Sequence, residues 1–321
     1  MSSGALKRAI TRYLVHKRAL GYRYRHEGWL LGAVYRHIRA EGGAELDAGA
    51  YDRWSNSIRH RHSNTRRKWQ QILRNFCLYR HRTDRRCFVP PADGFAKLQP
   101  YVTPVIVEPE HVARLLAKAS QLEPTATSPL QGPSMRLAVV LLYTCGLRLG
   151  ELLRLLLGDV EEDGAVLRIR ESKFHKTRLV PLSASAADEL RAFLLLRRQA
   201  FGSSLSAPLL CNRVGGHVHG YSRPGMQGAL RRLFIAANVR DQSGRLPRVH
   251  DLRHSFAVQA LVRWYQDGAD VQSNLPKLAL YMGHVSIESS AHYLHSVPLL
   301  RALASERFER RFGELVAGDV P

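Results

Sequence analysis

A proline-rich stretch from residue 90 to residue 104 is the feature that most restricts how this chain of 321 residues can fold. Pro90, Pro91, Gly94 and Pro104 interrupt the regular apolar spacing on either side, and such residues favour loops over helices or strands. The length allows about two domains. The sequence therefore predicts an N-terminal domain over residues 1–90, a linker over 91–106 and a second domain over 107–321.

Apolar residues recur at helical spacing in three segments before the linker, namely Ala5–Val15, Trp29–Ile38 and Trp69–Tyr79. Glycines between residues 42 and 49 separate the second helix from the third. The N-terminal domain is therefore expected to be entirely helical.

The second domain is expected to be mainly helical with a small antiparallel β-sheet. Acidic residues around Pro109 are typical of a helix start. Apolar and polar residues alternate in Ala165–Arg170 and Arg178–Leu182, which predicts two β-strands. Met135–Tyr143 and Leu147–Leu157 are predicted as buried helices, and everything after about residue 183 is predicted to be mainly helical. A final helix over 297–316 carries an apolar stripe, and it is expected to pack either on its own domain or on a neighbouring protomer.

The chain is strongly basic, with a formal charge of +21, and residues 1–100 carry +14 of it. Such asymmetry fits a domain that lies along a polyanion, because Lys and Arg displace counterions from phosphates. A solvated basic surface or nonspecific RNA affinity would give the same composition.

The densest basic run, from residue 59 to residue 68, is expected to form a loop and then open a helix. Ser63, Asn64 and Thr65 are good helix caps, and a helix N-terminus can meet a phosphate. The histidines of the run are poor metal ligands because arginines crowd them. The predicted DNA contacts of this run are Arg59, Arg61, Arg66, Arg67 and Lys68.

The four cysteines have neither metal-ligand spacing nor the density of a disulfide-stapled secreted protein. Basic residues interrupt the N-terminus, and no apolar stretch approaches the roughly 20 residues that span a membrane. The sequence thus predicts a soluble cytoplasmic protein, associated with the nucleoid, that has no membrane contact.

Tyr293 lies nine positions after His284, and upstream stand two arginines, a lysine and a further histidine. A phenol becomes a nucleophile only near its pKa of about 10. It therefore needs neighbours that accept its proton and cations that stabilise the charge growing on a phosphate. This set of residues fits an attack on a DNA phosphodiester without a metal.

Four segments that carry these residues resemble the tyrosine recombinases, the phage-integrase-type site-specific recombinases. They are Tyr143–Leu152 with Arg148, Ser172–Leu182 with Lys173, His250–Ala257 with Arg253, and Met282–Tyr293 with His284. Each segment alone is a weak signal, but four in the family's order are a strong one. The resemblance implies a helical core-binding domain, SAM-like in fold, ahead of a tyrosine recombinase catalytic domain.

The resemblance also implies a role for each residue. Arg148 and Arg253 bind the scissile phosphate, His250 supports acid–base chemistry, Lys173 protonates the leaving 5′ oxygen, His284 hydrogen-bonds the phosphate, and Tyr293 forms a 3′-phosphotyrosyl link. Glu151, on the same helix face as Arg148, orients its guanidinium. Lys176 and Arg178 compete with Lys173 near the turn and are expected to contact DNA. No cofactor and no metal are expected.

Taken singly, these residues have ordinary explanations. Arg148 with Glu151 resembles a surface helix pair, Lys173 a solvated turn lysine, and Tyr293 a core or interface tyrosine with Tyr281 as its near rival. Their order along the chain reverses that preference. From Arg253 to His284 the chain runs 31 positions, several more than in compact members, and this form is similar to recombinases of transposons and insertion elements.

The expected function is site-specific cleavage and rejoining of double-stranded DNA by a homotetramer, a dimer on each recombination site, with accessory proteins setting direction. A type IB topoisomerase would share the chemistry but relax supercoils as a monomer. A noncatalytic DNA-binding protein on the same scaffold is the second rival, and the intact set of catalytic residues argues against it. Integration, excision, inversion and transposition all remain open as outcomes.

Overall fold

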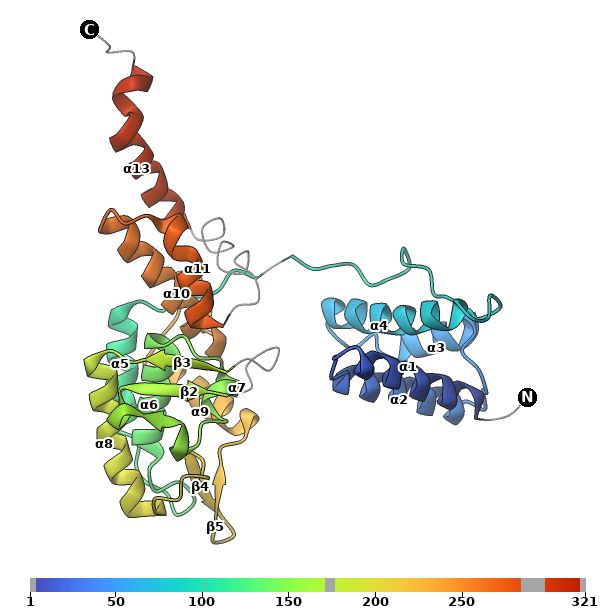
Figure 1. The fold of residues 1–321 in the computed structure, drawn as a ribbon, viewed down its shortest axis with the longest axis horizontal. Helices are drawn as coiled ribbons and strands as arrows, with labels where there is room; N and C mark the ends of the chain where they lie inside the picture. Colours follow the sequence, from blue (N-terminus) through green and yellow to red (C-terminus); the bar gives the residue numbers. More distant parts are fainter. Residues whose placement is uncertain (1–3, 101, 171–176, 284–297, 318–321) are drawn as a thin grey trace. The chain divides into compact units, whose positions relative to one another are not determined.

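The chain forms two compact units, Met1–Val102 and Thr103–Pro321. This computed structural model describes residues 4–100, 102–170, 177–283 and 298–317, and within the last range it describes side chains for 300–310. The division lies inside the stretch 91–106 predicted as the linker. Figure 1 shows the elements of both units. No helix in the described ranges is both long and apolar enough to cross a membrane.

The N-terminal unit contains the helices α1 (Ala5–Ala19), α2 (Arg25–Ala40), α3 (Ala48–Ser57) and α4 (Ser63–His81). The three predicted helices are confirmed, and α3 is an addition. Asp47 begins α3 by accepting a hydrogen bond from the backbone N–H of Ala50 at 2.7 Å. Tyr13, Leu31 and Phe76 lie in one core with Trp54 of α3. Each large apolar side chain buried in this way contributes roughly 1.5–3 kcal/mol.

Much of the predicted linker is packed on α4. The backbone N–H of Gln99 donates to the Asn64 side chain at 2.7 Å, and that of Ala96 donates to the Gln70 side chain at 2.9 Å. Phe95 is buried. Two of the predicted caps, Ser63 and Asn64, thus hold residues 97–99, whereas the imidazole of His62 caps α4.

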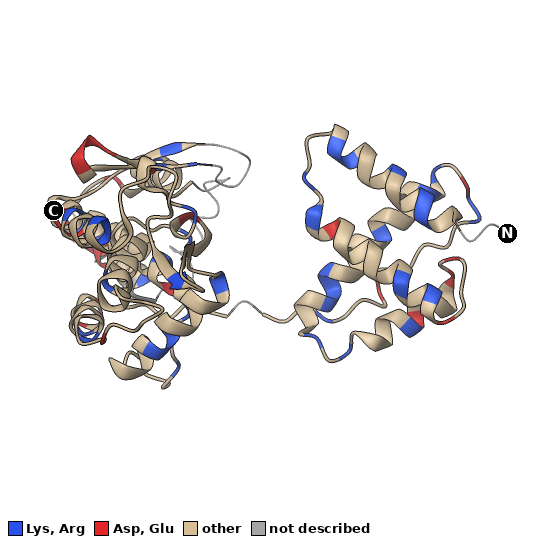
Figure 2. Ribbon diagram, turned by 90° about the horizontal axis from the view of Figure 1, so that it is seen from below, with Lys and Arg blue, Asp and Glu red and all other residues tan. Residues whose placement is uncertain are grey.

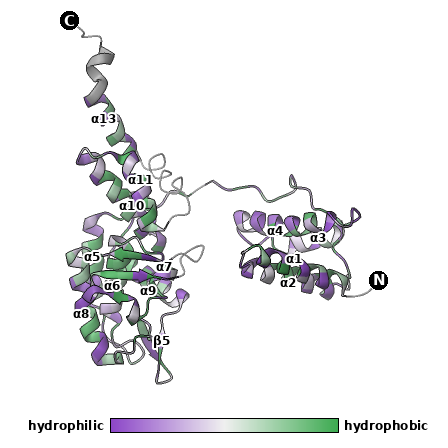
Figure 3. Cartoon of the chain, in the orientation of Figure 1, coloured by the Kyte–Doolittle hydropathy of each residue, from purple (hydrophilic) through white to green (hydrophobic). Residues whose placement is uncertain are grey.

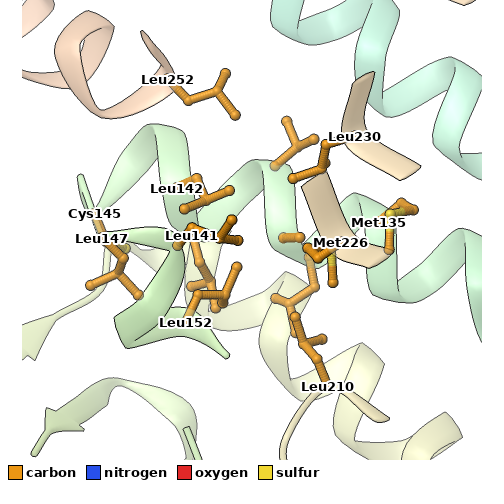
Figure 4. Packing of buried hydrophobic residues seen from close by; sticks show 14 of the residues in the cluster. Met135, Leu141, Leu142, Cys145, Leu147, Leu152, Leu210, Met226, Leu230 and Leu252 are labelled. Carbon is orange, nitrogen blue, oxygen red and sulfur yellow. The ribbon is translucent and has the colours of Figure 1, made fainter. Parts of the chain in front are cut away.

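The second unit is built around a central apolar helix. Its helices before the sheet are α5 (Pro109–Ser120), α6 (Gln131–Thr144) and the one-turn α7 (Leu149–Leu152). Figure 3 shows that α6 is hydrophobic along most of its length. Leu141 and Leu142 of α6 are completely buried or nearly so. Figure 4 shows them beside Met226 and Leu230, two members of the same core cluster.

A three-stranded antiparallel sheet of order β1-β2-β3 follows α7. Its strands are β1 (Val160–Glu161), β2 (Val166–Ile169) and β3 (Arg178–Pro181), with short 3₁₀ turns at Leu157–Asp159 and Glu162–Gly164. Ile169 pairs with Arg178 at the end of the β2–β3 hairpin. The predicted strands and the predicted small sheet are confirmed.

The rest of the unit is mainly helical, as expected. It contains α8 (Ala184–Phe201), α9 (Arg223–Ala236), α10 (Val249–Gln266), α11 (Val271–Met282) and α13 (Pro298–Ala317). One hairpin interrupts them, made of β4 (Cys211–Val214) and β5 (His217–Gly220). Its two-residue turn, Gly215–Gly216, has positive φ at both positions, which glycine adopts readily.

The predicted helix over Leu147–Leu157 is wrong beyond its first turn. After α7 the chain is extended at Leu156, which forms an antiparallel bridge with Pro208. On either side, Leu157 donates its N–H to the carbonyl of Ala207, and Leu155 accepts from Leu209. Leu155, before this bridge, and Leu157, which begins the following 3₁₀ turn, are both buried. A short run of leucines fits a buried strand as well as a buried helix, so the pattern alone did not distinguish them.

The first turns of α13 pack on their own unit. Leu300 is 1% exposed and lies in a cluster with residues of α10 and α11, and Leu303 packs against the same cluster. The guanidinium of Arg307 donates to the carbonyl of Ala269 at 2.8 Å. Of the two predicted packing modes, the one on its own domain therefore holds for this part of the helix, and a truncation after Pro298 would remove core.

Leu300→Ala is expected to destabilise the second unit by about 2–5 kcal/mol, the usual cost of a cavity left by a buried leucine. Chemical denaturation would measure the loss. Phe308→Ala is the matched control, because the Phe308 side chain is 57% exposed and its removal opens no cavity. Equal stability of the Leu300 variant and the wild type would show that α13 is not part of the core.

Candidate active site

Arg148 begins α7 directly after a turn that only glycine fits. Gly146 has φ +58°, and a Cβ there would lie 2.5 Å from the Phe256 ring. This close approach brings the end of α6 against α10. Arg148 then caps α7 together with Glu151, whose carboxylate accepts from the Arg148 backbone N–H at 2.9 Å and from its Nη1 at 2.7 Å.

Glu151 is the centre of an arginine cluster. Its carboxylate is buried, and Arg178 of β3 grips it with Nη1 at 3.1 Å and Nη2 at 3.0 Å. Arg253 of α10 places its Nη1 3.9 Å from the same carboxylate. Burial opposes ionisation, but the hydrogen bonds and charges of Arg178 and Arg148 outweigh it and lower the pKa of Glu151 to about 2. Glu151 is thus a carboxylate at any working pH.

Arg253 is almost completely buried despite its charge, with a side chain 2% exposed. Its Nη1 donates to the carbonyl of Gly146, and its Nη2 donates to the carbonyl of Met282 at 2.8 Å. Arg148 likewise donates from Nη2 to the carbonyl of Gly283 at 2.8 Å. The cluster therefore joins the start of α7, the start of α10 and the end of α11.

His250 lies one helical turn before Arg253, near the start of α10. Its ring meets that of His254 edge to face, with 4.7 Å between centroids. Desolvation of the charged ring, and then the charge of Arg253, lower the pKa of His250 to about 4. Its imidazole is therefore neutral near pH 7. A neutral imidazole has both a donor and an acceptor nitrogen, which suits it to take or give a proton.

The structure brings together Arg148, Arg253, Glu151 and the start of the helix that carries His250. Lys173, Lys176, His284 and Tyr293 lie outside the described residues. In sequence, the two lysines lie between β2 and β3, and His284 directly follows Gly283.

Arg178 was expected to contact DNA, but it lies at the start of β3 and points toward Glu151. Its side chain is 10% exposed and is engaged with Glu151. This ion pair was missed because nothing in the local sequence links β3 to α7. The only available signal was the alternation of the strand, which puts Arg178 and the buried Val180 on the same face.

Three of the arginines and lysines predicted to contact DNA from the basic run of the N-terminal unit are exposed, namely Arg59, Arg61 and Lys68. Arg66 and Arg67 are partly buried and donate to the carbonyls of Arg59 and Ala96. Figure 2 shows further Lys and Arg along the helices of this unit. Within the described residues, no three His, Cys, Asp or Glu side chains are grouped as metal ligands would be.

Comparison with known sequences gives a consistent result. A model of the phage integrase family matches residues 107–298. A putative integrase/recombinase of Sinorhizobium fredii, y4rB, is 32% identical over 312 residues, which is 95% of this chain and 98% of that relative. The tyrosine recombinase XerD of Corynebacterium glutamicum is 34% identical over 161 residues, covering 50% of this chain and 47% of the relative.

Two solved structures share the fold. The Tn1549 transposon integrase in complex with transposon right end DNA has a TM-score of 0.65 at 14% identity, over 95% of this chain and 98% of that one. The XerH site-specific recombinase bound to palindromic difH substrate has a TM-score of 0.60 at 18% identity, over 95% and 84% of the two chains. At such low identity these likenesses concern the arrangement of elements.

Proposed function

This chain belongs to the phage integrase family, and from that membership we propose that it is a site-specific DNA recombinase that works through a 3′-phosphotyrosine on Tyr293. The observation that carries the proposal is the arginine cluster. Arg148 and Arg253, far apart in sequence, converge on Glu151 beside the end of α11. From that point the chain continues to His284 and Tyr293.

In the proposed reaction the Tyr293 oxygen attacks the scissile phosphorus and the bond to the 5′ oxygen breaks. The phenolic proton passes to a neutral base, for which His250 is the candidate, and Lys173 donates a proton to the leaving 5′ oxygen. Arg148 and Arg253 stabilise the charge on the phosphate oxygens. The phosphotyrosyl ester keeps the energy of the broken phosphodiester, so a 5′ hydroxyl of another strand can reverse the step without ATP.

The proposed partner is double-stranded DNA carrying recombination sites, bound by a dimer on each site and a tetramer across two. The DNA-bound state of the solved Tn1549 and XerH proteins supports a DNA partner here. The Tn1549 integrase also supports the proposal that this chain serves a mobile element.

A covalent-trapping experiment tests the function. The DNA flanking the gene is divided into overlapping short duplexes. Each carries a nick placed so that the short piece with the new 5′ hydroxyl diffuses away after cleavage. Each duplex is incubated with the full chain in EDTA. We expect one duplex to yield an adduct that survives denaturation, since side-chain cations supply the charge stabilisation. Exchange of strands between two such duplexes indicates a recombinase. Cleavage without exchange, together with relaxation of a separate supercoiled plasmid, would indicate a topoisomerase. Binding without any adduct would indicate a noncatalytic protein.

Binding to an arbitrary duplex is expected to weaken steeply with salt. In a plot of the logarithm of the binding constant against the logarithm of the salt concentration, each phosphate contacted contributes about −0.9 to the slope. Replacing Arg59, Arg61 and Lys68 by Gln should then flatten the slope by roughly 2–3, because all three are exposed cations. Fluorescence anisotropy over a salt series measures the slope. Arg53→Gln in the same unit is the control, since Glu41 already neutralises Arg53. An unchanged slope in the triple variant would remove this run from the DNA interface.

A further inference from the structure

Three successive carbonyls at the end of α11 are each capped by a different arginine of the cluster. Arg178 Nε donates to Tyr281 at 2.9 Å, Arg253 Nη2 to Met282 at 2.8 Å, and Arg148 Nη2 to Gly283 at 2.8 Å. The last carbonyls of a helix have no partner within the helix, and positive charge near them is favourable. The end of α11 is thereby fixed to residues from three other elements.

Arg178 is more completely engaged with protein acceptors than Arg148 is. Both terminal nitrogens grip the two oxygens of Glu151, and Nε holds Tyr281, so each of its three nitrogens donates to a protein acceptor. Its side chain is 10% exposed, whereas that of Arg148 is 26% exposed. This geometry suits a residue that holds Glu151 and the end of α11 in place.

The position of Arg178 in the fold lets it contact two parts of the site, α7 and the end of α11. It stands at the start of β3, directly after the turn that carries Lys173. Its forked contact with Glu151 reaches α7, where Glu151 holds Arg148. Its contact with Tyr281 reaches the end of α11, from which the chain runs on to Tyr293. The end of α11 is also closely packed, because a Cβ on Gly283 would lie 2.7 Å from Arg178 Nη1.

We propose that Arg178 is a positioning residue for the proposed strand cleavage: by clamping Glu151 to the end of α11, it fixes the direction of Arg148 and the point from which the chain leaves for Tyr293. The proposal rests on the proposed function for its meaning in catalysis. The planar guanidinium is required, because a lysine keeps the charge but cannot grip two carboxylate oxygens and a carbonyl at once.

Arg178→Lys is therefore expected to lower the single-turnover rate of adduct formation by about 100-fold, the scale of a misplacement of about 1 Å in an active site. Affinity for the same duplex should stay within about twofold, because the charge is kept and the side chain does not face solvent. The control is Arg191→Gln on α8, which removes an arginine paired with Asp188 and should leave both values unchanged. A wild-type cleavage rate in the Lys variant would overturn the proposal.

A pH profile separates positioning from a general loss of stability. Burial raises the pKa of Glu151, and hydrogen bonds from Arg178 contribute most to lowering it. Arg178→Gln therefore raises this pKa, so Glu151 takes up a proton and releases Arg148 at a higher pH than in the wild type. The acid limb of the cleavage rate should shift to higher pH in the Gln variant, and less so in the Lys variant. An unshifted acid limb in the Gln variant would contradict action through Glu151.

A double-mutant cycle tests the same link directly. If Arg178 acts through Glu151, Arg178→Gln should slow cleavage far less in a Glu151→Gln background than in the wild type. The double variant removes both charges of this pair, so neither Glu151 nor Arg178 is left buried without the other. The Glu151→Gln single variant supplies the reference for the effect on Arg148 and Arg253, which also face this carboxylate. Multiplicative effects of the two substitutions would show independent roles and reject the proposal.

Hydrogen exchange without DNA gives a readout that does not depend on activity. Amides of the last turn of α11, around Leu280–Gly283, should exchange faster in Arg178→Lys than in the wild type and the Arg191→Gln control. Unchanged exchange there would overturn the clamp. If the wild type forms no adduct with any duplex but the Lys variant still loosens this turn, the clamp stands and the proposed function fails.

Discussion

Tyr293→Phe is expected to abolish the covalent protein–DNA adduct while leaving DNA affinity nearly unchanged. Only the attacking oxygen is lost, and the cationic surface that binds DNA remains. The rate should fall on the order of 10⁶-fold, the scale seen when an enzyme loses its nucleophile. Denaturing gels of nicked duplexes measure the adduct, and anisotropy measures binding on the same preparation.

Tyr281→Phe is the matched control for that experiment. The Tyr281 hydroxyl donates to the carbonyl of Pro181 at 3.1 Å, and its ring stacks on Phe256 with 5.5 Å between centroids. Burial and then the neighbouring Cys145 raise the pKa of Tyr281, which makes its phenol a poor nucleophile. The Phe variant at this position should keep its adduct. An adduct that survives at Tyr293→Phe and disappears at Tyr281→Phe would exchange the two roles.

Arg148→Ala is expected to cost about 3–4 kcal/mol of transition-state stabilisation, or roughly 100- to 1000-fold in the cleavage rate. The Arg148 side chain is 26% exposed and one of its nitrogens caps Gly283, so the fold does not depend on it alone. Arg178 continues to hold Glu151 when Arg148 is absent. Single-turnover cleavage at saturating enzyme would isolate this effect from binding.

Two comparisons sharpen the result for Arg148. Arg136 of α6 pairs with Glu189 of α8, away from the cluster. The Arg136→Ala variant should therefore cleave DNA at the wild-type rate. Arg253→Ala should lose folding stability as well as activity, because Arg253 is buried and satisfies the carbonyls of Gly146 and Met282. Wild-type cleavage by Arg148→Ala would end its assignment as a phosphate ligand.

The sequence predicted the residues of the cluster but not the way they are joined. The spacing of Arg148 and Glu151 implied one helical turn, and this contact is present. The pairing of Glu151 with Arg178 depends on how β3 packs against α7, a long-range contact that no local pattern encodes. For that reason the sequence assigned Arg178 to the DNA surface, whereas its side chain is only 10% exposed and is paired with Glu151.

The fold was predicted best where the helical spacing of apolar residues was regular, as in α1, α2 and α4. Shorter elements were missed although signals were present. Asp47 followed by Tyr51 and Trp54 fits a capped helix, and Gly215–Gly216 fits a two-residue hairpin turn. The leucines around Leu155 were predicted as helix because they are buried on all sides. Such a segment has no polar face, so its sequence does not distinguish the helical repeat from the strand repeat.

The proline-rich stretch is itself attached to both units, through Gln99 and through Pro104, which leaves a very short tether between them. Gln99 is hydrogen-bonded to α4, and Pro104 and Val105 are buried, so the chain between them reaches at most roughly 15–18 Å. If both units bind DNA, the first to bind presents the second at an effective concentration on the order of millimolar. Two weakly binding surfaces would then act as one tight ligand, and lengthening the tether would weaken the whole chain without altering either surface.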